Sequence, residues 1–139
     1  MDFKKFENKI FFRIDKGEEI VNSVKHICKE LNIKTGTITG LGATDKITIG
    51  IFNINTKKYH TTEFTGDHEI SQLYGNISSM SEDVYLHIHV TICDIKHQSF
   101  GGHLNSAIVS ATFEGVIEEI DGKVNRSFDG ESGLNLIKF

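Results

Sequence analysis

The sequence contains no proline, no tryptophan, and only two arginines and two cysteines. Without proline the chain cannot contain an AT-hook, a DNA-binding motif built on an Arg-Gly-Arg-Pro core. The cysteines, Cys28 and Cys93, lie far apart, and the first residues are charged rather than apolar. This pattern favours reduced thiols and a cytoplasmic location. No apolar run approaches the roughly 20 residues that cross a bilayer, so we expect no membrane-spanning segment.

Positive charge is also scarce, since 15 lysines and arginines face 19 acidic residues and give a net charge of −4. A protein that binds nucleic acid by itself usually carries a strongly basic surface. The short pairs Lys4-Lys5 and Lys57-Lys58 are typical of solvated turns rather than of a phosphate-binding track. The charge therefore argues against DNA as a partner.

The length of 139 residues fits one domain spanning residues 1–139. Helical spacing of apolar residues predicts a single main helix over about residues 18–31. Alternating patterns and turn residues predict strands at 9–15, 34–44, 46–53, 59–64, 69–78, 84–93, 107–120, 124–128 and 134–139, with a turn at Gly66-Asp67. We predict an α+β domain in which one helix packs on a curved, mostly antiparallel β-sheet.

The strand at 84–93 carries the clearest candidate for chemistry. One face is aliphatic and is expected to face the core: Val84, Leu86, Ile88, Val90 and Ile92. His87 and His89 then stand together on the opposite face, with Cα atoms about 6.6 Å apart. Two imidazoles at this spacing can converge on one metal ion, for which Zn–N distances are about 2.0–2.1 Å.

The segment Gly101-Gly102-His103 is the candidate source of a third ligand. Two glycines let the backbone adopt positive φ and approach its neighbours closely, so the histidine after such a turn can be aimed at an adjacent strand. Three imidazoles with an open fourth position describe a zinc-like site. The alternative is that these histidines lie on a solvated or interfacial face.

Arg126 is a second candidate, because arginine in a chain that prefers lysine often serves planar recognition of a carboxylate. It would then bind a small anion beside the metal. The alternative, which we favour at this point, is a structural ion pair with Glu63, Glu69, Asp129 or Glu131. Glu69 and Asn76 are expected either to face the metal cavity as hydrogen-bond partners of the histidines or to satisfy backbone at a subunit interface.

Several motifs in one order resemble the PPC (plants-and-prokaryotes-conserved) domain over residues 13–136. They are Gly-Leu-Gly-Ala at 40–43, Glu-Ile-Ser-Gln-Leu-Tyr-Gly-Asn-Ile at 69–77, Leu-His-Ile-His at 86–89, Gly-Gly-His-Leu at 101–104, and the segment 126–134. The resemblance implies a homotrimer, each subunit having an antiparallel sheet and a helix. It also implies that His87, His89 and His103 are grouped as a metal site.

Plant members of the PPC family follow AT-hooks and mediate association with partner proteins, and free-standing prokaryotic members are candidate DNA-binding proteins. This sequence resembles the free-standing type without an AT-hook. DNA is thus a partner that the resemblance suggests and the charge opposes, since a trimer carries three times the charge of −4 and repels a polyanion.

Two functions stay open from the sequence. The first is a zinc-containing homotrimeric PPC protein that acts as a DNA-binding, regulatory or interaction module. The second is a metalloenzyme that acts on a small molecule, with the tri-histidine ion activating water or polarising a carbonyl. No Gly-x-Ser-x-Gly elbow is present, so nucleophilic serine catalysis is poorly supported. Whether the chain is an enzyme is not decided by these residues.

Overall fold

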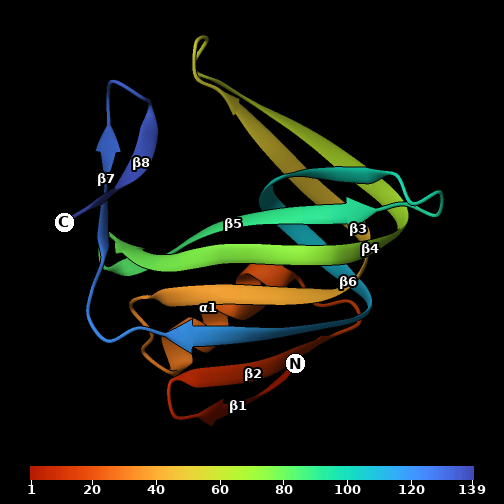
Figure 1. Ribbon diagram of the computed structural model, residues 1–139, viewed down its shortest axis with the longest axis horizontal. Coiled ribbons are helices and arrows are strands. Elements are labelled where there is room, and N and C mark those ends of the chain that lie inside the picture. Colours follow the sequence, from red (N-terminus) through yellow and green to blue (C-terminus); the bar gives the residue numbers. More distant parts are fainter.

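The computed structural model describes residues 1–139 and is mostly β-sheet with one short helix (Figure 1). The elements are β1 (Asp2–Phe6), β2 (Lys9–Asp15), α1 (Ile20–Glu30), β3 (Gly36–Asn53), β4 (Lys58–Met80), β5 (Asp83–Cys93), β6 (Ser99–Glu119), β7 (Asn125–Asp129) and β8 (Leu134–Lys138). The predicted α+β class is confirmed. No helix is both long and apolar enough to cross a bilayer.

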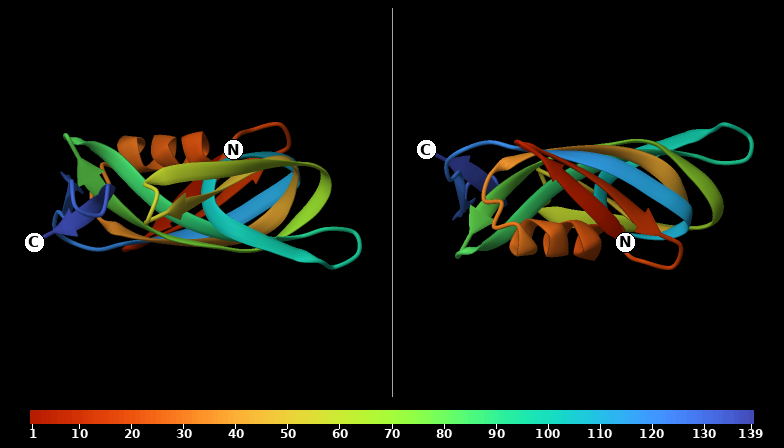
Figure 2. Two further views of the ribbon diagram at one scale, coloured as in Figure 1. Left: turned by 90° about the horizontal axis from the view of Figure 1, so that it is seen from above. Right: turned by 90° about the horizontal axis from the view of Figure 1, so that it is seen from below.

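The strands form one curved sheet in the order β1-β2-β6-β3-β4-β7-β8. All neighbouring pairs are antiparallel except β4 and β7, which meet in parallel at Ser79 and Asn125. Because β5 pairs with both β4 and β6, the four long strands β3 to β6 close into a circuit of hydrogen bonds. The sheet therefore curls, as Figure 1 shows, and α1 packs against its apolar core face, along one side of the molecule (Figure 2).

The helix begins where Glu19 caps it. The Glu19 carboxylate accepts hydrogen bonds from the backbone N–H of Val21 at 3.0 Å and of Asn22 at 2.8 Å, which satisfies two free donors of the first turn. A third bond, from the N–H of Ala107 at 3.0 Å, ties this helix end to β6. The apolar stripe of α1 is buried, and burial raises the pKa of the Cys28 thiol to about 12. Both cysteines are free.

The strands are longer than the sequence pattern predicted. The segments 34–44 and 46–53 join into β3, and 59–64 and 69–78 join into β4. The predicted turn at Gly66-Asp67 is wrong: Gly66 has φ of +89° and lies within β4, opposite a register shift between Thr44 and Lys46. A β-bulge bends a strand without ending it. The glycine that the pattern assigned to a chain reversal therefore lies at a bend within one continuous strand.

The first strand, β1, was not predicted. Phe3 is partly buried, and the other four residues of β1 are exposed. The consecutive lysines Lys4 and Lys5 interrupt any alternation of apolar and polar residues. It forms because β2 offers a free edge, with Phe3 opposite Phe12 in the antiparallel register. Long-range pairing, rather than local pattern, therefore creates this strand.

Candidate metal centre

Three imidazoles meet on the outward face of β5 and β6. Within β5 the aliphatic residues Ile88 and Val90 are buried, so His87 and His89 point the other way. His89 lies directly opposite His103 of β6 in the antiparallel register, and opposite residues share a face of the sheet. The ring centroids are 5.1 Å apart for His87 and His89, 5.4 Å for His87 and His103, and 5.7 Å for His89 and His103.

The two glycines before His103 act through close packing. Gly101 and Gly102 lie inside β6 and neither has positive φ, so the expected turn is wrong. A Cβ on Gly101 would lie 2.9 Å from the Val90 carbonyl oxygen of β5. A Cβ on Gly102 would lie 2.6 Å from Ile49 Cγ2 of β3. The glycines thus let β6 approach β5 and β3 at once, which brings His103 to the other two histidines.

Burial favours the neutral form of two of these rings. It is the main cause that lowers the pKa of both His87 and His103 from the ordinary value of 6.5. Repulsion by neighbouring positive charge lowers both pKa values further. For His87 this repulsion comes from His89 and Arg126. The neutral imidazole is the form that binds a metal ion, so this environment suits a ligand set.

The three rings fit a borderline ion such as zinc. One donor nitrogen from each ring lies within 4.8 Å of the others. Tetrahedral zinc holds such nitrogens about 3.3 Å apart, so the rings would have to approach one another by up to about 1.5 Å to share an ion. Three imidazole nitrogens without an oxygen ligand favour zinc over magnesium or calcium, which prefer oxygen. A three-ligand set leaves one coordination position for another group.

A cavity of about 490 Å³ lies over the three histidines. Its walls come from the β3–β4 arm, from β5 and β6, and from the β7–β8 hairpin, and the lining residues are Gly50, Ile51, Phe52, Tyr59, Tyr85, His87, His89, Gly102, His103, Arg126, Leu134, Asn135 and Leu136. None of them is acidic. Tyr59 stands edge-on to His103 with centroids 6.3 Å apart and donates its hydroxyl proton to Asn105 Oδ1 at 2.7 Å.

Arg126 enters this cavity from β7 and forms no ion pair. Its Nε donates to Ser78 Oγ at 2.8 Å, one terminal nitrogen to the Asn135 carbonyl at 2.8 Å, and the other to Asn76 Oδ1 at 2.7 Å. The guanidinium also lies over the Tyr85 ring, 4.9 Å from its centroid. The favoured prediction of an ion pair with a nearby carboxylate is therefore wrong.

Of the other two candidates from the sequence, Asn76 lies near the cavity and Glu69 does not. Asn76 lies opposite His87 in the register and holds Arg126, so it belongs to the surroundings of the cavity. Glu69 lies opposite Ala43 and Cys93, is exposed, and does not line the cavity. It is not brought together with the histidines.

Sequence reasoning missed several residues of this cavity. Tyr85 shares the alternating face of His87 and could have been found from the strand pattern. Tyr59 and Asn135 come from two hairpins far away in the sequence, and no local spacing indicates that they reach β5.

Comparison with known proteins decides the family. The model of the Plants and Prokaryotes Conserved (PCC) domain matches residues 1–121. The chain belongs to this family. It is the family, abbreviated PPC above, that the sequence motifs indicated. No curated protein matches the chain.

Three solved structures are similar to this protein over nearly the whole chain. A candidate DNA-binding protein from Bacteroides thetaiotaomicron is 40% identical, with a TM-score of 0.97, covering 99% of this chain and 96% of that one. A metal-containing protein from Archaeoglobus fulgidus is 29% identical, with a TM-score of 0.88 and coverage of 99% and 97%. A PPC protein from Pyrococcus horikoshii is 28% identical, with a TM-score of 0.86 and coverage of 99% and 94%. The β7–β8 hairpin thus lies within the shared fold, although the family match ends before it.

Proposed function

We propose that this PPC-domain protein binds one divalent metal ion, most simply zinc, through His87, His89 and His103. The observation that carries the proposal is the clustering of three ring nitrogens within 4.8 Å of one another on two paired strands. The lowered pKa values of His87 and His103 add support, because they keep the imidazoles neutral. The similar protein from Archaeoglobus fulgidus is described as metal-containing.

Metal analysis of protein purified without a histidine tag tests this proposal. We expect one equivalent of zinc per chain, and His103→Ala should remove it. The matched control is His97→Asn, which changes an exposed histidine outside the cluster; asparagine tolerates the φ of 61° at that position. Zinc retained at full stoichiometry in His103→Ala would show that the ligand set is wrong.

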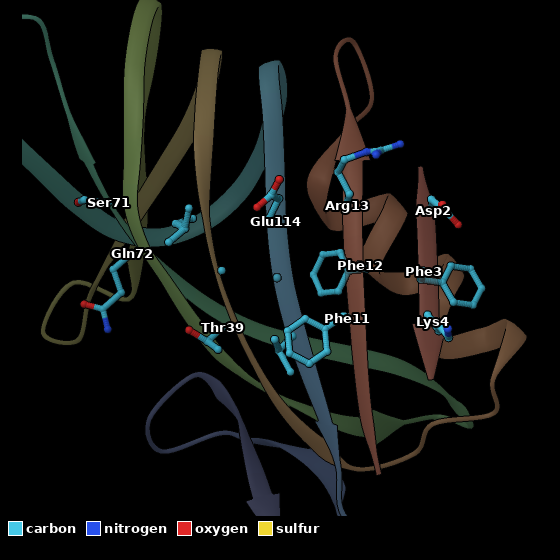
Figure 3. Close-up of a pocket in the computed structure, with 14 residues that line it drawn as sticks. Asp2, Phe3, Lys4, Phe11, Phe12, Arg13, Thr39, Ser71, Gln72 and Glu114 are labelled. Carbon is cyan, nitrogen blue, oxygen red and sulfur yellow. The ribbon is translucent and has the colours of Figure 1, made fainter. Parts of the chain in front are cut away.

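We further propose that the chain assembles as a homotrimer through the outward face of its sheet. Phe11, Leu41 and Tyr74 stand on this face with exposed fractions of 55%, 61% and 56%. Leu41 also lines a wide cavity of about 770 Å³. Phe11 lies in the same lining (Figure 3). An apolar surface of this kind is typical of an interface.

The strand register links this outward face to the histidines. Cross-strand partners run from Phe11 to Val116, Thr39, Tyr74 and finally His89. Since partners directly opposite each other share one face of the sheet, the apolar row ends at the histidine cluster. A subunit packed on the row would therefore lie close to the ion.

We propose that this assembly acts in the cytoplasm as a regulatory or interaction module and does not bind DNA by itself. DNA binding is named for a similar protein from Bacteroides thetaiotaomicron. This chain, however, has a net charge of −4, and one of its two arginines, Arg13, is paired with Asp15. Gel shifts across a salt series decide between the two, because micromolar affinity with a steep salt dependence would support DNA binding.

The open cavity favours a second candidate, a metalloenzyme that acts on a small molecule. A bound zinc ion with a free position supplies Lewis acidity toward an oxygen of the substrate. The residues of this chain would contribute the walls, the cation Arg126 and the hydroxyl of Tyr85. No carboxylate lines the cavity to act as a general base. Ester or amide hydrolysis that disappears on chelation and returns with zinc would support the enzyme.

A further inference from the structure

The cavity over the three histidines has an unbalanced charge. Arg126 is a permanent cation, and none of the 13 lining residues is acidic. A divalent ion held by neutral imidazoles would add further positive charge. The chain as a whole is acidic, with a net charge of −4, so this absence of carboxylates is a local feature of the cavity and not a consequence of composition.

The guanidinium of Arg126 is held by neutral groups only. Its three hydrogen-bond partners are a hydroxyl, an amide oxygen and a backbone carbonyl, from Ser78, Asn76 and Asn135. These bonds use three of the five N–H groups of an arginine, and one N–H on each terminal nitrogen makes no hydrogen bond within the protein. Burial lowers the pKa of Arg126, which is the direction expected for a cation that is desolvated without an anionic partner.

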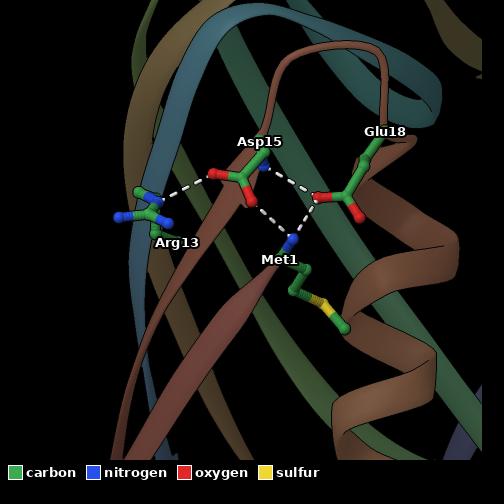
Figure 4. Close-up of polar contacts among 4 residues, drawn as sticks. All are labelled: Met1, Arg13, Asp15 and Glu18. Carbon is green, nitrogen blue, oxygen red and sulfur yellow. Dashed lines mark hydrogen bonds and ion pairs between the residues drawn. The ribbon is translucent and has the colours of Figure 1, made fainter.

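The other arginine of the chain provides the contrast. Arg13 donates from Nε to Asp15 Oδ1 at 2.8 Å, and Asp15 also accepts from the ammonium of Met1 at 2.6 Å (Figure 4). Hydrogen bonding to Asp15 raises the pKa of Arg13. Its charge is therefore already satisfied within the fold, whereas that of Arg126 is not.

We propose that the cavity binds a small organic acid whose carboxylate pairs with Arg126. The inference deepens the proposed function, since it names the class of molecule that shares the cavity with the metal ion. A carboxylate matches the planar fork of a guanidinium and can accept from both terminal nitrogens. The apolar walls formed by Ile51, Phe52 and Leu136 suit a hydrocarbon or aromatic body. A volume of about 490 Å³ lies in the range of small-molecule sites.

The geometry also relates this carboxylate to the ion. Arg126 lies over Tyr85, and Tyr85 precedes His87 by one outward position on β5, a Cα separation of about 6.6 Å. The guanidinium and the histidine cluster are thus neighbours along one strand face. The acid that fits both ends carries, beside its carboxylate, a second oxygen function a few bonds away that can reach the open coordination position.

The test compares the responses of Arg13 and Arg126 to the same ligand within one protein. With only Arg13 and Arg126 in the chain, their Nε–Hε resonances are two signals in an NMR spectrum, and Arg13→Lys assigns them. Phenylacetate is titrated into the metal-free protein, and phenylacetamide, its neutral analogue of the same shape, serves as control. We expect phenylacetate to shift the Arg126 signal saturably and to leave that of Arg13 in place, and phenylacetamide to shift neither.

Variants then measure the effect on affinity. Arg126→Gln should weaken phenylacetate binding at least about tenfold, as expected for the loss of a charged hydrogen-bond pair, and Arg13→Gln should leave it unchanged. The comparison on unaltered protein stands even if Arg126→Gln loosens the β7–β8 hairpin. Equal shifts of both arginines, equal affinity for acid and amide, or no saturable shift at Arg126 would overturn the proposal.

The design separates this inference from the proposed metal function. Because the titration begins with metal-free protein, a chain that takes up no zinc would still show the Arg126 shift if the anion site exists. Conversely, a missing anion site would leave the zinc stoichiometry and its loss in His103→Ala unaffected.

Discussion

The two large cavities of this protein lie on the same sheet but differ in the charges that line them. The wider one, of about 770 Å³, is lined by both signs of charge, with Asp2 and Glu114 beside Lys4 and Arg13. The smaller one, of about 490 Å³, holds three imidazoles and Arg126 and has no carboxylate. The wider cavity contains charges of both signs, and its apolar side chains fit the proposed subunit interface. In the smaller cavity the positive charge of Arg126 has no negative charge beside it. Charge and donor chemistry, rather than size, therefore favour the smaller cavity as the site of the proposed ligand.

The largest effect is expected from filling the backbone contact that builds the smaller cavity. In Gly102→Ala the new Cβ would lie 2.6 Å from Ile49 Cγ2 and 2.8 Å from the Gly50 carbonyl oxygen, so β6 must move away from β3. We expect zinc affinity to fall about tenfold or more and the free energy of unfolding to fall by about 1–3 kcal/mol. Competition with a coloured chelator and urea denaturation measure the two quantities.

The matched control for this substitution is Gly130→Ala, because a Cβ at Gly130 meets no atom within 4 Å and its φ is not positive. It should change neither quantity. If Gly102→Ala bound zinc as tightly as the unaltered chain, close approach of β6 would not be what positions His103.

A charge on the wider cavity should break the assembly and leave the smaller cavity intact. Leu41→Glu places a carboxylate on the exposed apolar face, so we expect the mass in solution to fall from three times 15.6 kDa to 15.6 kDa. Size-exclusion chromatography with light scattering measures this mass. Ile95→Glu alters a side chain with an exposed fraction of 87% outside that face and should leave the trimer intact. A monomeric unaltered chain would contradict the proposed interface.

The pH dependence of the metal-free protein should report the buried imidazoles. His87 and His103 have pKa values lowered below the ordinary 6.5, so the unfolded chain binds protons at a higher pH than the folded chain. As pH falls below 6.5, the free energy of unfolding should therefore decrease, and it should level off once the folded pKa values are passed.

Urea denaturation above and below pH 6.5 checks this dependence. The decrease should become smaller in His103→Gln, which removes one of the two imidazoles, and persist in His97→Asn. A pH dependence that is identical in His103→Gln and in the unaltered chain would show that these groups do not cause it.

The smallest effect is expected on the free energy of unfolding when each of the two arginines is replaced by lysine. Arg126→Lys loses the fork that joins Ser78, Asn76 and Asn135, so we expect the free energy of unfolding to fall by about 1 kcal/mol. Arg13→Lys changes an exposed pair and should leave the unfolding midpoint unchanged. Equal destabilisation by both substitutions would remove the distinction between the two arginines.

Local pattern was sufficient for much of this architecture. Helical spacing predicted α1 to within two residues at its start, and alternation predicted the outward pairing of His87 and His89. The same reasoning joined His103 to them, although for the wrong local reason, because the glycines before it lie in a strand instead of a turn.

Register and long-range pairing could not be read in the same way. Only the antiparallel alignment of β5 and β6 brings His89 opposite His103. Arg126 was expected to pair with a carboxylate, and one of its three actual partners, Asn76, lies 50 residues away on β4. Such contacts depend on how hairpins fold back on the sheet, and this is not encoded in the spacing of neighbouring residues.

Anomalous diffraction at the zinc edge, on crystals of the untagged protein supplemented with zinc, tests the central claim most directly. The account predicts one anomalous peak per chain, bonded to one nitrogen each of His87, His89 and His103 at about 2.0–2.1 Å. No peak between the three rings, or zinc held only by other residues, would contradict it.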